Sequence, residues 1–240
     1  MATLYGVGVG PGDPLLITLK ACQLIANTQV VSYLANDKGE SQAAFIAREA
    51  FAQVSHKQLH LPIPMPMSTD RTLANKAYDQ GAQEIAEQLK SGEDVVFLCE
   101  GDPLFFGSFS YLLERLQGLY QIQVVPGVSS VHAAAAALQL PLTLQRESFA
   151  VISGRHSDQQ IRRALVEHDS LVIMKAGLAR ERILALLAET GRSQQANYLE
   201  YISRDNQLIN TDVSSLTLEA GPYFSLFVVT KKRQQVSQSA

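Results

Sequence analysis

Three short apolar stretches in the first 130 residues each lead directly into a loop rich in glycine or proline. The stretches are residues 4–7, 95–99 and 122–124, and the loops that follow them are residues 8–14, 100–103 and 125–130. Parallel strands bring their carboxyl ends to one edge of a sheet, and open α/β sheets bind ligands at that edge. The pattern therefore predicts one cleft shared by the three loops, which favours a small-molecule enzyme over a scaffold protein.

Strand and helix patterns alternate through the first 140 residues. Strands are expected over residues 4–9, 30–33, 95–99 and 122–125, and helices over residues 18–27, 41–51, 71–91, 109–116 and 130–138. Residues 61–67 contain three prolines, which lack amide donors, so this segment is expected to be extended but not a central strand. Alternation in this order predicts a parallel sheet with helices on both faces.

A domain boundary is expected near Pro141, with an N-terminal domain of residues 1–140 and a C-terminal domain of residues 141–240. In the second domain, strands are expected at residues 149–153, 171–175, 197–201 and 223–230, and helices at residues 158–167 and 179–190. The predicted fold class is therefore α/β, with two α/β domains. The polar tail from Lys232 is expected to be frayed.

Charge and hydropathy exclude several classes of protein. The formal net charge of −3 argues against a nucleic-acid binder, for which a basic surface is expected. No apolar run approaches the ~18 residues that a membrane span needs, and no signal peptide pattern is visible, so we expect a cytoplasmic protein without a membrane partner. Residues 1–140 carry 8 Lys and Arg against 13 Asp and Glu, whereas residues 141–240 carry 12 against 10. The second half is thus the better place to hold a polyanionic substrate.

The first loop reads Gly-Val-Gly-Pro-Gly and matches a dinucleotide fingerprint only superficially. Its third glycine is misplaced, a proline stands where a helix should begin, and no acidic residue follows about 20 residues later. Glycines here allow the backbone to approach a ligand closely, while Pro11 and Pro14 stiffen the turn. A purely structural turn is the alternative interpretation.

The second and third loops carry polar side chains. Glu100 and Asp102 flank Gly101 after a buried strand, and they suit a ligand with ribose hydroxyls or a cationic centre. Asp102 alternatively caps the segment that follows it. Ser129 and Ser130 stand at the expected start of a helix, where they either cap it or donate hydrogen bonds to a ligand.

Neither a metal site nor a nucleophile is predicted. His56 and His60 are four residues apart but lead into the proline-rich segment with no third ligand nearby, and the other histidines are isolated. The sequence has no Gly-x-Ser-x-Gly motif, and neither Cys22 nor Cys99 has a matched histidine. Both cysteines are expected to be buried reduced thiols.

In this order and spacing, the three loops resemble those of the tetrapyrrole (class III) S-adenosylmethionine-dependent methyltransferases, and the resemblance extends along the whole chain. Residues 98–109, 169–175 and 222–226 are most similar to the precorrin-2 C-20 methyltransferases of cobalamin biosynthesis. Uroporphyrinogen methylases typically carry Gly-Gly-Asp-Pro where this chain has glutamate at position 100. They also tend to have a Tyr-Met pair where this chain has Met174 and Lys175.

The resemblance implies a homodimer of two-domain subunits with the active-site cleft between the domains. The implied reaction moves a methyl group from S-adenosylmethionine to the C-20 meso carbon of precorrin-2 or its cobalt-bearing counterpart. The implied cofactor-binding residues are Pro11, Glu100, Gly101, Asp102, Phe105, Ser129, Ser130, Met174, Lys175, Ser225 and Leu226. No catalytic residue is predicted, because the sequence shows no convincing catalytic dyad, and alignment of a nucleophilic carbon with a sulfonium methyl group needs no general base of strongly shifted pKa.

A substrate with eight carboxylates suits arginine and lysine side chains. The candidates are Arg146, Arg155, Lys175, Arg180 and Arg204, and the tyrosines that could orient the macrocycle or relay protons are Tyr111, Tyr201 and Tyr223. The alternatives are a methylase of another ring position, a dinucleotide-binding oxidoreductase and a non-enzymatic tetrapyrrole carrier.

Overall fold

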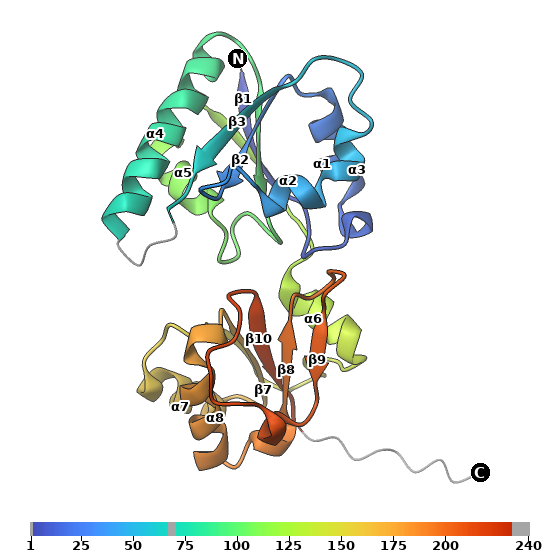
Figure 1. The fold of residues 1–240 in the computed structure, drawn as a ribbon, viewed down its shortest axis with the longest axis vertical. Coiled ribbons are helices and arrows are strands. Elements are labelled where there is room, and N and C mark those ends of the chain that lie inside the picture. The colour runs from blue at the N-terminus through green and yellow to red at the C-terminus, as the bar shows by residue number, and fades with distance from the viewer. Residues whose placement is uncertain (1, 67–70, 232–240) are drawn as a thin grey trace, which may run out of the picture. The chain divides into compact units, whose positions relative to one another are not determined.

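The computed structural model describes residues 2–66 and 71–231. The chain divides into two compact units, an N-terminal unit of Met1–Ser130 and a C-terminal unit of Val131–Ala240 (Figure 1). The division falls at the start of helix α6 (Ser130–Leu138), a helix that a boundary near Pro141 would leave whole in the N-terminal domain.

A five-stranded parallel sheet forms the centre of the N-terminal unit, in the order β3-β2-β4-β1-β5. Its strands are β1 (Thr3–Gly8), β2 (Val30–Ala35), β3 (Leu59–Pro64), β4 (Val95–Cys99) and β5 (Gln121–Val125). Every residue of β4 is buried, as a central parallel strand covered on both faces requires. The predicted parallel sheet is confirmed.

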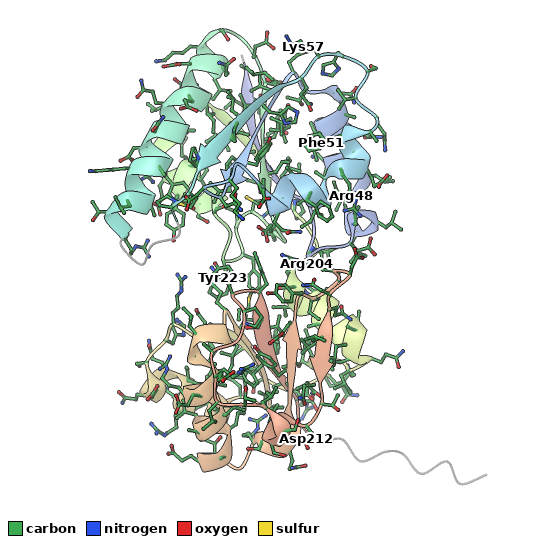
Figure 2. All side chains as sticks on the ribbon, viewed as in Figure 1. Arg48, Phe51, Lys57, Arg204, Asp212 and Tyr223 are labelled. Atoms are coloured by element: carbon green, nitrogen blue, oxygen red, sulfur yellow. The ribbon has the colours of Figure 1, made fainter. Side chains whose placement is uncertain are left out.

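Helices cover both faces of this sheet (Figure 1). The helices are α1 (Leu19–Asn27), α2 (Gln42–Ile46), α3 (Arg48–Phe51), α4 (Arg71–Lys90) and α5 (Phe109–Leu116). Figure 2 labels Arg48 and Phe51, the first and last residues of α3. Helices α1 to α3 share a core cluster with Val96, whereas α4 and α5 share another with Phe97. Consecutive strand residues point to opposite faces, so the two helix groups lie on opposite sides.

Two segments of the N-terminal unit differ in detail from the expected elements. The helix expected over residues 41–51 is interrupted at Ala47, whose ψ of 4° separates α2 from α3. The proline-rich segment forms the edge strand β3. Leu59 and Met65 donate hydrogen bonds from their backbone amides toward β2. Backbone nitrogens alternate between the two edges of a strand, so those of Pro62 and Pro64, at the intervening even-numbered positions, face away from β2. Position 67 of the expected segment lies outside the described residues.

The C-terminal unit has a mixed sheet in the order β6-β7-β10-β8-β9, in which only β6 and β7 are parallel. Its strands are β6 (Phe149–Ser153), β7 (Ser170–Met174), β8 (Ala196–Glu200), β9 (Leu208–Asn210) and β10 (Ser225–Val229). Helices α7 (Asp158–Glu167) and α8 (Arg180–Glu189) pack on the sheet through a cluster that includes Phe227. The tail that we expect to be frayed from Lys232 lies outside the described residues.

Short 3-10 helices complete the described elements: η1 (Pro14–Leu16), η2 (Gly177–Ala179), η3 (Ser193–Gln195) and η4 (Val213–Ser215). Among the helices of the described chain, none combines the length and apolar character needed to cross a membrane.

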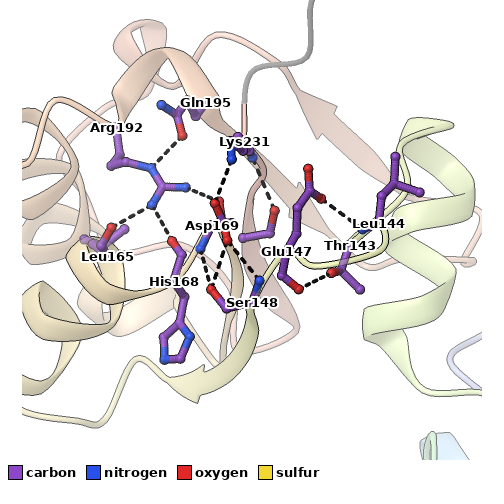
Figure 3. A network of polar contacts seen from close by, with 11 residues as sticks. Thr143, Leu144, Glu147, Ser148, Leu165, His168, Asp169, Arg192, Gln195 and Lys231 are labelled. Carbon is purple, nitrogen blue, oxygen red and sulfur yellow. Dashed lines mark hydrogen bonds and ion pairs between the residues drawn. The ribbon is translucent and has the colours of Figure 1, made fainter.

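A polar network around Asp169 connects residues at the ends of three strands of the C-terminal unit (Figure 3). The Asp169 carboxylate accepts hydrogen bonds from the Ser148 amide at 2.9 Å, the Ser148 hydroxyl at 3.1 Å and the Lys231 ammonium at 3.0 Å. The Arg192 guanidinium donates to three main-chain oxygens, those of Leu165, His168 and Asp169. The network thereby joins the ends of β6, β7 and β10.

We expect this network to make stability depend on pH in acid. The hydrogen bond from the Ser148 amide, followed by that from Lys231, lowers the pKa of Asp169 from 3.8 to about 2. A carboxylate with a depressed pKa stabilises the fold above its ordinary pKa and loses that contribution as the pH falls through its folded value. Between about pH 4 and about pH 2, the urea midpoint should fall more steeply for the native protein than for Asp169→Asn. Equal slopes would show that folding does not lower the pKa of Asp169.

Candidate functional site

The three glycine-containing loops of the N-terminal unit meet at one end of its sheet. They follow β1, β4 and β5, which are neighbours in the sheet. Gly10 and Gly101 form an isolated antiparallel bridge, in which the Gly101 amide donates to the Gly10 oxygen at 2.8 Å. We call residues 8–14, 100–103 and 125–130 the N-terminal loop cluster, which is the grouping that the strand pattern predicts.

Glycine is required where these loops touch. A Cβ atom on Gly8 would lie 2.5 Å from the Gly101 oxygen and 2.6 Å from the Gly127 nitrogen. A Cβ atom on Gly127 would also overlap the Gly101 oxygen. All of the obstructing atoms belong to the backbone, so a side chain at either position would push the loops apart. We call Gly8, Gly101 and Gly127 the glycine junction.

The Asp102 carboxylate ties the second loop to the third. One oxygen, Oδ1, accepts the amides of Leu104 at 2.9 Å and Phe105 at 3.1 Å, and Oδ2 accepts the Gly127 amide at 3.2 Å. Asp102 therefore organises the turn that follows it, while α5 begins further on, at Phe109. Its contact with a ligand stays a prediction.

The N-terminal loop cluster lies at a point of the sheet topology that favours ligand binding. Strands β1 and β4 are adjacent, but the helices that follow them, α1 and α5, pack on opposite faces of the sheet. Such a strand pair is a topological switch point, where open α/β sheets bind ligands. Pro11 is buried in the first loop here, and Glu100 is half-buried in the second.

The remaining predicted residues of this unit lie in or beside the same loops. Ser129 is buried and Ser130 begins α6. The Ser129 Cα would lie 3.9 Å from a Cβ on Gly101, so the third loop passes close to the second. Phe105 packs edge-on against Phe106, whose φ of 55° is unusual for a bulky side chain. Sequence reasoning did not single out Phe106, because no pattern reports its backbone angle.

The four predicted residues of the C-terminal unit also gather at one end of its sheet. Met174 ends β7 and pairs with Leu226 of β10. The Ala176 amide donates to the Ser225 oxygen at 3.2 Å, and Lys175 between them has a φ of 53°. The loops at this end are residues 154–157, 175–179, 201–207 and 220–224, which we call the C-terminal loop cluster.

Close backbone packing also holds this second cluster together. The Gly154 amide donates to the Met174 oxygen at 2.7 Å, and the Gly221 amide donates to the Gly177 oxygen at 3.0 Å. A Cβ on Gly154 would lie 2.9 Å from the Lys175 oxygen. Sequence reasoning missed these glycines, although Gly154 directly follows a strand and so carries the signal used for the first loops.

One candidate for binding a substrate carboxylate is occupied by structural contacts. Arg180 is buried, and its Nε donates to the Glu219 main-chain oxygen at 2.6 Å. Its Nη2 donates to the Thr217 hydroxyl at 3.1 Å, and its Nη1 lies 3.7 Å from a Glu200 carboxylate oxygen. Arg180 therefore belongs to the interior of the C-terminal unit, which corrects its place among the substrate-binding candidates.

Cys99 is buried and Cys22 is half-buried, and both are free thiols. Burial raises the pKa of Cys99 to about 12, which keeps it protonated at neutral pH. In the part of the chain that the structure describes, no group of three or more His, Cys, Asp or Glu side chains could hold a metal ion.

The sequence model of the Tetrapyrrole (Corrin/Porphyrin) Methylases matches residues 3–217. The chain belongs to the tetrapyrrole methylases. This tetrapyrrole methylase is 32% identical to the precorrin-2 C(20)-methyltransferase of Sinorhizobium sp, with 94% of each chain covered. It is 31% identical to the cobalt-precorrin-2 C(20)-methyltransferase of Salmonella typhimurium, with 95% of this chain and 96% of the relative covered.

A longer relative shares the same region. The cobalamin biosynthesis protein CobIJ of Mycobacterium bovis is 33% identical over 97% of this tetrapyrrole methylase. The match covers 47% of CobIJ, so the chain spans about half the length of that relative.

Solved structures of other methylases share the fold. The cobalt precorrin-4 methyltransferase CbiF superposes with a TM-score of 0.72 at 21% identity, covering 95% of this chain and 94% of CbiF. The native uroporphyrin III C-methyl transferase of Thermus thermophilus gives a TM-score of 0.68 at 24% identity, covering 95% and 97%. These likenesses show that the two α/β units of this tetrapyrrole methylase form the fold of the family.

Proposed function

We propose that this tetrapyrrole methylase transfers a methyl group from S-adenosylmethionine to the C-20 meso carbon of precorrin-2 or its cobalt-bearing counterpart, in cobalamin biosynthesis. The observation that carries the proposal is the similarity to two proteins named for that reaction, each over more than nine-tenths of this chain. The Glu-Gly-Asp-Pro sequence of the second loop and the Met174-Lys175 pair support methylation at C-20 over the reaction of the uroporphyrinogen methylases. Methylation at another ring position is the alternative within the family.

The residues proposed to hold the methyl donor lie in or beside the loop cluster of each unit. In the N-terminal unit these are Pro11, Glu100, Gly101, Asp102, Phe105, Ser129 and Ser130, and in the C-terminal unit Met174, Lys175, Ser225 and Leu226. The glycine junction fits this role, because it brings the loops that carry Glu100 and Ser129 into backbone contact. The amino terminus of α6 favours an anionic group, which suits the carboxylate of the methionine portion.

Catalysis is proposed to depend on orientation. A bound sulfonium supplies an electrophilic methyl group, and the meso carbon of a reduced tetrapyrrole is already nucleophilic. Alignment of donor and acceptor can contribute roughly 7–11 kcal/mol toward lowering the barrier. Asp102 acts in this scheme by fixing the second and third loops, since its carboxylate receives three backbone amides.

Calorimetric titration with S-adenosylhomocysteine, followed by NAD in the same cell, tests the cofactor class. We expect binding of S-adenosylhomocysteine and no heat from NAD, because the first loop lacks the features of a dinucleotide site. NAD binding without S-adenosylhomocysteine binding would favour an oxidoreductase and contradict the proposal. The family resemblance also supports a homodimer, which light scattering after gel filtration tests through the mass of the particle.

A further inference from the structure

The C-terminal loop cluster contains an arginine that contacts aromatic rings. The Arg204 guanidinium carbon lies 4.0 Å from the centre of the Phe224 ring and 5.9 Å from that of Tyr201. Tyr223 packs edge-on against Phe224, and both rings are more than a third exposed. Figure 2 labels Arg204 and Tyr223 at one end of the C-terminal unit, with Asp212 at the other.

Backbone strain accompanies this group. Six non-glycine residues of the described chain have a positive φ, and three of them lie in the C-terminal loop cluster: Lys175, Tyr201 and Ser203. Hydrogen bonds hold the strained turn, from the Tyr201 amide to the Phe224 oxygen at 2.9 Å and from the Ser203 amide to the Gln207 side chain at 2.8 Å. Strained residues persist where the surroundings over-determine them, and they cluster at ligand sites.

The contact with the Phe224 ring restrains the Arg204 guanidinium. A guanidinium with its face on a ring directs its donors along its own plane, in a geometry that matches a carboxylate. The other arginine candidates differ from Arg204 in their burial or in their position on the sheet. Arg180 is buried in structural contacts, Arg155 is exposed, and Arg146 precedes β6 and so lies at the opposite end of the sheet.

We propose that Arg204, oriented by Phe224, binds a side-chain carboxylate of the tetrapyrrole substrate. The inference rests on the proposed function for its substrate class. It assigns Arg204 to the substrate rather than to the methyl donor, and it makes Phe224 a positioning residue that acts through Arg204.

The test compares Arg204→Gln and Arg204→Lys with a matched control, Arg163→Gln. Arg163 lies on α7, where it is well exposed and pairs with Glu167 one turn away. The probe is uroporphyrin III, a stable tetrapyrrole with eight carboxylates, whose binding is followed by fluorescence quenching. Affinity for S-adenosylhomocysteine is measured on the same samples and reports whether each variant remains folded.

Arg204→Gln should weaken uroporphyrin III binding by about tenfold or more, as expected for loss of a charge-assisted hydrogen bond. Its affinity for S-adenosylhomocysteine should stay within about twofold of the native value. Arg204→Lys should recover part of the loss, and Phe224→Leu should weaken binding less than Arg204→Gln does. The control should bind both ligands normally.

Uroporphyrin III binding within about twofold of native in Arg204→Gln would overturn the inference, as would failure of the native protein to bind this probe. The proposed function fails separately, if the native protein binds uroporphyrin III but transfers no methyl group to precorrin-2 or to its cobalt-bearing counterpart. In that case the comparison of Arg204 variants still decides whether Arg204 binds carboxylates.

Discussion

Gly8→Ala should weaken S-adenosylhomocysteine binding by about a hundredfold. The added Cβ would lie 2.5 Å from the Gly101 oxygen and 2.6 Å from the Gly127 nitrogen, and neither backbone atom can rotate away. Overpacking of this kind costs about 3 kcal/mol at the upper end of its usual range. If the junction opens to relieve the overlap, the loops proposed to hold the cofactor lose their alignment, and that energy corresponds to about two orders of magnitude in affinity.

Isothermal titration of the variant measures this effect, and Gly39→Ala is its control. Gly39 has a φ of 77° and no atom within 4 Å of an added Cβ, so its substitution introduces backbone strain without overlap. We expect Gly39→Ala to lose some stability but to bind S-adenosylhomocysteine normally. Native affinity in a folded Gly8→Ala protein would show that the glycine junction does not shape the cofactor site.

Arg180→Met should destabilise the C-terminal unit by about 3–5 kcal/mol, the usual cost of removing one partner of a buried ion pair. Arg180 is 8% exposed, and the Glu200 carboxylate that it faces is 13% exposed. The substitution also removes the donors to the Glu219 oxygen and the Thr217 hydroxyl. Urea unfolding followed by circular dichroism measures the change.

Two further variants separate this explanation from general damage. Arg163→Met removes an exposed arginine from the same unit and should change stability little. Adding Glu200→Leu to Arg180→Met removes the stranded carboxylate and should restore part of the lost stability. A loss below about 1 kcal/mol for Arg180→Met alone would mean that the arginine is not needed to compensate Glu200.

The sequence predicts elements well where burial determines the residue pattern. Strand β4 has the predicted bounds, because all five of its residues are apolar and buried while its flanking residues are acidic. Strand β9 was missed, because it is three residues long and its Leu208 and Ile209 are exposed. The break at Ala47 was also missed, since alanine favours helix and the sequence pattern therefore continues through it.

The candidate site is predictable in its grouping but not in the contacts of individual side chains. Loops that follow neighbouring parallel strands must meet, so the approach of Gly10 to Gly101 follows from the strand pattern. The burial of Arg180 and the stacking of Arg204 on Phe224 depend on segments that only the folded sheet brings together. No local sequence pattern distinguishes these two arginines.

The most direct test of the account is methyl transfer by the purified protein from S-adenosylmethionine labelled with ¹³C in its methyl group. Precorrin-2 and its cobalt-bearing counterpart are offered in separate reactions, and the products are analysed by ¹³C NMR. We expect one new methyl group, attached at C-20, in at least one of the two reactions. A methyl group at another ring position, or no transfer to either tetrapyrrole by protein that binds S-adenosylhomocysteine, would contradict the proposed function.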